Sequence, residues 1–149
     1  INHTHCVGCG RCIGSCLFDA ITPASDETNT ILSEKIAEYT YAVLNGKQHF
    51  HISFVIDVSP YCDCHNFNDL PIVDDIGIFA SSDPVALDKA CADAVNQGRV
   101  VTGSMLEKNR KQKDYITTVN PKTDWIHSLE YAFEIGLGSL EYDLISLDK

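Results

Sequence analysis

Four cysteines within eleven residues constrain this chain more than any other feature of its sequence. They form the run Cys6-Val-Gly-Cys9-Gly-Arg-Cys12-Ile-Gly-Ser-Cys16, which has C-x2-C-x2-C-x3-C spacing. Thiolates at this spacing bind 4Fe–4S clusters in bacterial ferredoxins, where the fourth cysteine ligates a different cluster from the first three. We therefore expect Cys6, Cys9 and Cys12 to bind one 4Fe–4S cluster, Cys16 to serve another, and the missing ligands to come from elsewhere.

Two alternatives use the same cysteines differently. A disulfide framework fits poorly, because the chain has seven cysteines, an odd number, and several are bunched two residues apart. Zinc stays open, because thiolates at C-x2-C spacing bind it too, although zinc sites usually place about a dozen or more residues between two such pairs. A 4Fe–4S site that loads with zinc in the absence of iron is therefore part of the expectation.

Composition narrows the class of protein further. The chain has 149 residues, of which 44% are apolar, so it is long enough to bury a core without disulfides. No apolar run reaches the roughly 18 residues of a membrane span, and no export signal precedes the cysteines. The net charge of −10 disfavours nucleic acid and anionic membranes as partners and favours a basic protein. We expect a soluble, cytoplasmic protein with a redox partner protein.

The rest of the chain alternates helical and strand-like patterns, which predicts an α/β fold. A polar stretch before the first helix predicts a ferredoxin-like cysteine segment at 1–24, attached to a layered strand–helix domain at 25–149. In the second of these, Asp83 is the expected helix cap and Pro84 the first helical residue. The expected elements are a helix at 33–45, a buried strand at 50–58, a strand at 75–80, a helix from 84 to about 98, a mobile loop at 99–123, a helix at 125–135 and a strand at 142–147.

A second candidate site follows the strand predicted at 50–58. Cys62, Asp63, Cys64 and His65 are consecutive in a turn past the carboxyl end of that strand, where open α/β sheets often place functional groups. A turn could gather these side chains around a metal, with Asp57 or Asp83 nearby; equally, the two cysteines could simply pack as small apolar residues. For Cys91, on the apolar face of the helix beginning at 84, we expect core packing alone.

Several blocks together resemble a known but uncharacterised family. They are the cysteine run, Pro60-Tyr-Cys-Asp-Cys-His65, Pro71-Ile-Val-Asp-Asp-Ile-Gly-Ile-Phe-Ala-Ser-Ser-Asp-Pro-Val-Ala-Leu-Asp88 and Leu129-Glu-Tyr-Ala-Phe-Glu-Ile-Gly-Leu-Gly138. The chain is similar to ferredoxin-containing members of domain of unknown function 362. The resemblance implies that this is the C-terminal part of a longer protein, whose missing N-terminal region completes the α/β domain and supplies another ferredoxin-type run.

The resemblance gives no reaction, so three functional expectations stand together. The leading one is a 4Fe–4S protein that transfers single electrons. The second is a redox enzyme fragment in which the turn at 62–65 binds a metal or substrate and the cluster feeds it electrons. In the third, the cluster or a zinc ion only stabilises the fold.

Overall fold

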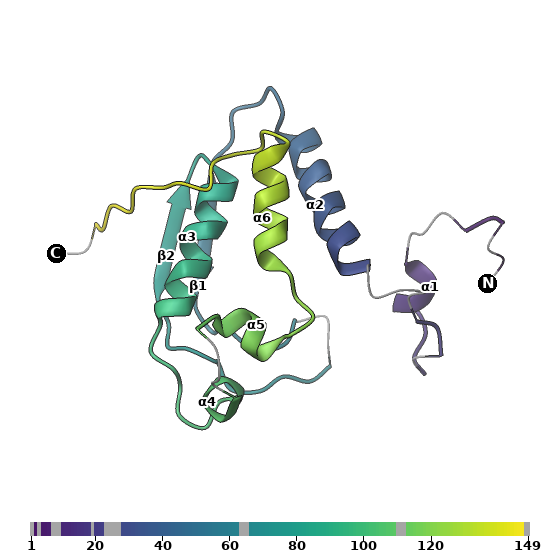
Figure 1. Cartoon of the computed structure of the whole chain (residues 1–149), viewed down its shortest axis with the longest axis horizontal. Helices are drawn as coiled ribbons and strands as arrows, with labels where there is room; N and C mark the ends of the chain where they lie inside the picture. Colours follow the sequence, from purple (N-terminus) through teal and green to yellow (C-terminus); the bar gives the residue numbers. More distant parts are fainter. Residues whose placement is uncertain are drawn as a thin grey trace.

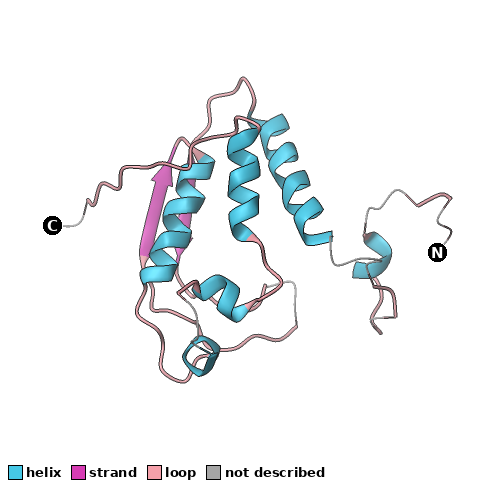
Figure 2. Ribbon diagram, in the orientation of Figure 1, coloured by secondary structure: helices cyan, strands magenta, loops and turns pink. Residues whose placement is uncertain are grey.

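The computed structural model describes residues 2, 4–6, 10–18, 20–22, 28–62, 66–109 and 113–147. It has mixed α/β structure, as predicted, with most of its elements helical (Figure 2). The elements are α1 (Arg11–Gly14), α2 (Thr28–Leu44), β1 (His51–Val55), β2 (Gly77–Ser81), α3 (Pro84–Gln97), α4 (Met105–Asn109), α5 (Tyr115–Val119) and α6 (Trp125–Glu134).

The described elements other than α1 form a layered body around a two-stranded sheet. Strands β1 and β2 pair antiparallel, from His51 opposite Ser81 to Val55 opposite Gly77. Helix α3 covers one face of this sheet and contacts α6, which in turn packs beside α2 (Figure 1). The order across the body is therefore sheet, α3, α6, α2.

Two apolar clusters hold these layers together. One joins the sheet and α3 to α4 and α5, and its buried members are Val55, Ile72, Val73, Val95, Leu106 and Tyr115. The other lies among α2, α3 and α6, and its buried members are Ala37, Val85, Leu129 and Ala132. Burial of apolar surface in these clusters supplies most of the stabilisation of the body.

Helix α3 confirms the signals that predicted it, and α6 confirms the helix predicted at 125–135. Asp83 caps α3, since its Oδ1 accepts the Ala86 N–H at 2.9 Å, and Pro84 opens the helix. Asp124 caps α6 by accepting the His127 N–H at 3.1 Å, and Gly136 follows that helix with a φ of 79°. Both caps satisfy N–H groups that the first turn of a helix leaves without a backbone partner.

Other expectations about local structure were wrong. Helix α2 begins at Thr28 rather than 33, and β1 is shorter than 50–58. Strand β1 is also buried on only one face, because Ile52 and Phe54 on its other face are 57% and 64% exposed. No strand forms at 142–147 within the described chain. The predicted boundary between 24 and 25 falls among residues 23–27, which lie outside the described residues.

The segment 99–123, predicted as a loop, contains both α4 and α5. Ser104 directly precedes α4, and its hydroxyl accepts the Glu107 N–H at 3.2 Å. In return, the Glu107 carboxylate accepts the Gly103 N–H at 2.6 Å. This arrangement resembles the capping box that Ser-x-x-Glu predicts. At α5, Asp114 accepts the backbone N–H groups of Ile116 and Thr117. Both caps are present in the sequence and would have predicted these helices.

Asp114 also ties α5 to α6, because its Oδ2 accepts the Trp125 indole N–H at 2.9 Å. Burial raises the pKa of the Asp114 carboxyl, but hydrogen bonds from Thr117, Trp125 and Ile116 outweigh it and hold the pKa below its usual value. A lowered pKa in the folded state stabilises the fold above the unfolded pKa of about 4, and this contribution is lost as the pH falls through the folded pKa.

We therefore expect Asp114→Asn to lower the free energy of unfolding at pH 7. This loss should become progressively smaller as the pH falls from about 5 towards 2. The measurement is urea unfolding at several pH values, followed by the fluorescence of Trp125, the single tryptophan of the chain. The difference in the free energy of unfolding between wild type and variant isolates the contribution of Asp114 from that of the other carboxylates. A difference that stays constant over this pH range would contradict the prediction.

Candidate functional site

The cysteine run lies on a segment apart from the layered body. Within the described residues, α1 has no extensive contact with any other helix or strand, and Figure 1 shows it beyond the N-terminal end of α2. Gly10, directly before α1, has a φ of 67°, a left-handed conformation that glycine adopts without strain. The backbone then turns tightly, with the Gly14 N–H donating to the Gly10 carbonyl at 3.1 Å.

This local backbone puts two of the predicted ligands at the surface. Cys12 lies in α1 and is exposed, as is Cys6, while Cys16 is partly buried. Cys9 lies outside the described residues, so the expected trio of Cys6, Cys9 and Cys12 stays a prediction. In the ranges that the structure describes, no three His, Cys, Asp or Glu side chains are grouped so that they could hold a metal ion.

The donor set nevertheless fits an iron–sulfur cluster in its chemistry. Thiolates are the ligands that 4Fe–4S clusters prefer, and the run provides them on a short, glycine-containing segment. Cys6 and Cys12 have no protein layer over them that would block cluster assembly, since both are exposed. No carboxylate-rich arrangement of the kind typical of magnesium or calcium sites competes for this segment.

Only the first residue of the second candidate site can be placed. Cys62 is exposed, whereas Asp63, Cys64 and His65 lie outside the described residues. The loop that carries them is closed at its base by Asn68, whose side chain accepts the Tyr61 N–H at 3.4 Å and donates to the Tyr61 carbonyl at 3.2 Å. Asn68 was not predicted from the sequence, although an asparagine just after a turn often forms hydrogen bonds with nearby backbone.

The carboxylates expected near this loop do not share one end of the sheet. Because the strands are antiparallel, Asp57 follows β1 at one end, whereas Asp83 follows β2 at the opposite end. The five residues of a strand separate these ends by about 17 Å. Asp83 is also fully engaged, since its Oδ1 caps α3 and its Oδ2 accepts the Ser139 N–H at 2.8 Å. Asp83 therefore caps α3 at the end of the sheet opposite Asp57, whereas residues 63–65 of the turn lie outside the described residues.

Asp57 occupies an unusual backbone position at the end of β1. Its φ of 48° is left-handed, the only such value for a residue other than glycine in the described part of the chain. Its N–H donates to the Asp75 Oδ1 at 2.9 Å, so Asp75 holds this turn in place. Aspartate tolerates this conformation better than most residues, which gives the pair a structural role in directing the chain towards Cys62.

Cys91 packs where it was predicted to pack. It is partly buried and contacts the cluster that joins the sheet to α3. Burial raises the pKa of its thiol, and a hydrogen bond with Ser53 only partly opposes this shift. A thiol that remains protonated at neutral pH is a poor metal ligand, so Cys91 is a core residue rather than part of either candidate site.

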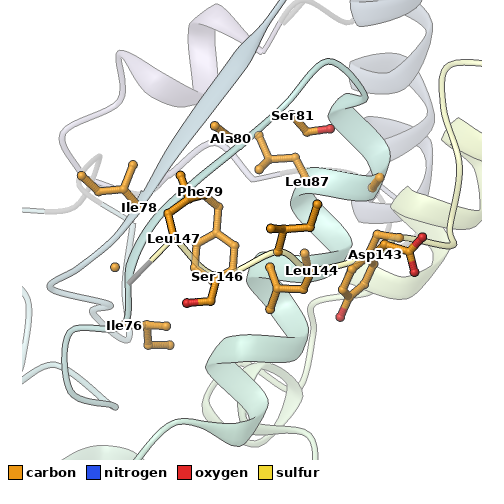
Figure 3. Close-up of a pocket in the computed structure, with 15 residues that line it drawn as sticks. Ile76, Ile78, Phe79, Ala80, Ser81, Leu87, Asp143, Leu144, Ser146 and Leu147 are labelled. Carbon is orange, nitrogen blue, oxygen red and sulfur yellow. The ribbon is translucent and has the colours of Figure 1, made fainter. Parts of the chain in front are cut away.

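One cavity lies between the sheet and the C-terminal stretch. It has a volume of about 470 Å³ and is bounded by β2, α3 and residues 142–147. Phe79 of β2 and Leu87 of α3 line it together with Leu144 and Leu147 of the C-terminal stretch (Figure 3). Tyr142 anchors the stretch by donating to the Asp93 Oδ2 at 2.9 Å. Because its lining is mainly apolar and lacks a cluster of ionisable groups, the cavity offers no evident catalytic machinery.

None of the helices within the described ranges combines the length and apolar character needed to cross a bilayer. A family model described as "Domain of unknown function (DUF362)" matches residues 4–93, which include the cysteine run, both strands and most of α3. The search of the curated proteins returned no match, and neither did the search of the solved structures.

Proposed function

The chain belongs to the family described as Domain of unknown function (DUF362), and for this member we propose a role as a 4Fe–4S protein that transfers single electrons. The observation that carries the proposal is the C-x2-C-x2-C-x3-C run. The surface position of Cys6 and Cys12, on a segment separate from the layered body, supports it.

In this proposal the cysteine segment binds the cluster, and the layered body presents the cluster to a partner. The thiolates of Cys6, Cys9 and Cys12 hold iron, and the left-handed Gly10 lets the backbone turn between the second and third of them. When bound, a 4Fe–4S cluster takes up or releases one electron at a potential set by burial and hydrogen bonds to sulfur. We further propose that the fourth ligand, and the cluster to which Cys16 belongs, involve polypeptide outside residues 1–149, because the ferredoxin pattern divides its cysteines between two clusters.

The surroundings of the run suit a protein partner. Leu17 and Phe18 directly follow Cys16 and are 92% and 89% exposed, so they offer an apolar contact next to the proposed cluster. The net charge of −10 would steer a basic partner towards the chain. We propose that the partner is a basic redox protein and that both work in the cytoplasm, where thiols stay reduced.

Anaerobic reconstitution with ferrous iron and sulfide tests the proposal. We expect a brown protein that, after reduction with dithionite, gives an electron paramagnetic resonance (EPR) signal typical of a reduced 4Fe–4S cluster. Iron and protein are measured on the same sample, for residues 1–149 and for a chain extended at its N-terminus. A colourless product without a signal from both chains would contradict the proposal, and zinc bound under the same conditions would favour the zinc alternative.

A Cys62→Ser/Cys64→Ser variant tests whether the loop at 62–65 provides a ligand to the cluster. If the run at 6–16 provides the ligands from this chain, the variant keeps the EPR signal and the iron content of the wild type. Loss of the signal would instead place a cluster ligand in the loop at 62–65.

A further inference from the structure

The C-terminal stretch, residues 142–147, is tethered to the body at its beginning. The Tyr142 hydroxyl donates to Asp93 Oδ2 on α3 at 2.9 Å. Beyond Tyr142 the chain extends past the sheet (Figure 1), and the side chains of Leu144 and Ile145 are 66% and 79% exposed. Large apolar side chains are therefore left in water directly after a residue that is held against α3.

Strand β2, which lies beside this stretch, has one edge without a strand partner. Among the described strands it pairs with β1 alone, so its other edge presents backbone N–H and C=O groups. The cavity of about 470 Å³ follows that edge, because it is lined by consecutive residues, 76–81, whose side chains alternate between the two faces of the sheet. Residues 142–147 form the facing wall, so two backbone segments of six residues face each other across the cavity.

We propose that residues 143–147 are a strap that closes on this edge and pairs with β2 as a third strand. The direction of the pairing follows from a second tether, in which the Ser139 N–H donates to Asp83 Oδ2 at 2.8 Å. Asp83 lies just after the end of β2, so a strap that starts there and follows β2 runs antiparallel to it. The product is a three-stranded antiparallel sheet, which is more stable than the two-stranded pair.

The alternation of side chains suits a strand in this position. Tyr142 points towards α3, so in an extended strap Leu144, two residues further on, lies on the same face. Helix α3 covers that face of the sheet, and its Leu87 lines the cavity together with Phe79 of β2 and with Leu144 (Figure 3). Closing therefore buries Leu144 against Leu87 and Phe79.

Closing buries no charge. Asp143, the single charged residue of the strap, lies on the outer face together with Ile145 and Leu147, and these three side chains stay in water. The gain is a set of backbone hydrogen bonds and the loss of an apolar cavity, opposed by the conformational entropy of ordering the strap. The strap therefore opens and closes, and when closed it blocks the edge of β2 against pairing with other polypeptide.

Hydrogen exchange of the ¹⁵N-labelled chain, measured by NMR, tests the closure. Free-edge amides of β2 have no strand partner in the described chain and exchange rapidly when the strap is open, whereas a closed strap protects them. We expect these amides to exchange faster by roughly tenfold or more in Leu144→Asp than in wild type, because a charge opposes burial of residue 144. We also expect cross-strand nuclear Overhauser effects (NOEs) between residues 77–81 and 143–147 in wild type.

Leu32→Asp is the matched control, because it makes the same change at a residue that is 54% exposed on α2, a helix that packs on α6 rather than on the sheet. It should leave the exchange of β2 unchanged. Tyr142→Phe is a second strap variant, which removes the tethering hydroxyl but keeps the ring, so it should speed the exchange by a smaller factor. Circular dichroism verifies that each variant is folded.

Three outcomes would overturn the proposal. One is the absence of NOEs between the strap and β2 in wild type. Another is equal exchange of the free-edge amides in wild type, Leu144→Asp and Tyr142→Phe. The third is an acceleration in Leu32→Asp as large as that in Leu144→Asp, since the protection would then reflect the stability of the whole body and not the strap.

Discussion

We expect Cys9→Ser to remove the EPR signal of the reconstituted, reduced protein and to lower its bound iron towards background. Cys9 is the middle cysteine of the three that the ferredoxin pattern assigns to one cluster. A serine hydroxyl ionises far less readily than a thiol and is a poor ligand for iron, so two thiolates of this chain remain for the cluster. Iron content, visible absorbance and EPR of the same anaerobic sample measure the effect.

Cys91→Ser is the matched control, because it makes the same chemical change at a cysteine that packs in the body. It should retain the signal and the iron content. Cys16→Ser adds a second comparison: if Cys16 serves a different cluster, the signal survives its loss in residues 1–149. A signal that persists in Cys9→Ser, or is lost equally in Cys91→Ser, would contradict the assignment of ligands to the run.

Leu106→Ala should lower the free energy of unfolding by about 2–5 kcal/mol. Leu106 comes from the short helix α4, has no exposed surface, and belongs to the cluster that joins α4 and α5 to the sheet and α3. Truncation removes apolar burial and leaves a cavity that the neighbouring helices cannot fully close. Urea unfolding followed by circular dichroism and by Trp125 fluorescence measures the loss.

Leu147→Ala controls for the substitution itself, since Leu147 is 91% exposed. Its effect should stay within about 0.5 kcal/mol. Equal effects of the two substitutions would mean that α4 is not packed on the body as described, and that residues 99–123 behave as the mobile loop that the sequence analysis predicted.

The sequence predicted those features that depend on neighbouring residues. Asp83 with Pro84 predicted the start of α3, because a cap needs only a side chain and the N–H groups two or three residues ahead. The Asp124 cap of α6 is of the same kind, although the helix at 125–135 was predicted from its apolar spacing alone. The Ser104 and Asp114 caps are equally local, so α4 and α5 could also have been found from the sequence. They were missed because a run of basic residues between them suggested a solvated loop.

Contacts between distant residues could not be predicted in this way. The antiparallel pairing of β1 with β2, which separates Asp57 from Asp83, depends on how the chain between the strands turns back. At 142–147 the apolar residues suit a strand, yet Tyr142 is anchored to Asp93 on α3 and no strand forms. Strand formation needs a partner in register, and the local sequence does not specify one.

The sequence by itself determined the cysteine spacing, and with it the proposed cluster chemistry, because C-x2-C-x2-C-x3-C is the spacing of 4Fe–4S ligands in bacterial ferredoxins. It also predicted helical periodicity at 33–45, within what the structure shows as α2. Only the tertiary structure decided which side of that helix faces the body. Contacts of Glu34 with His127 and of Glu38 with Tyr131 hold the polar side of α2 against α6. The apolar side chains of the opposite side are therefore left at the surface, namely Leu32, Ile36, Tyr39 and Val43. Periodicity defines the faces of a helix, but packing against other elements selects which face is buried.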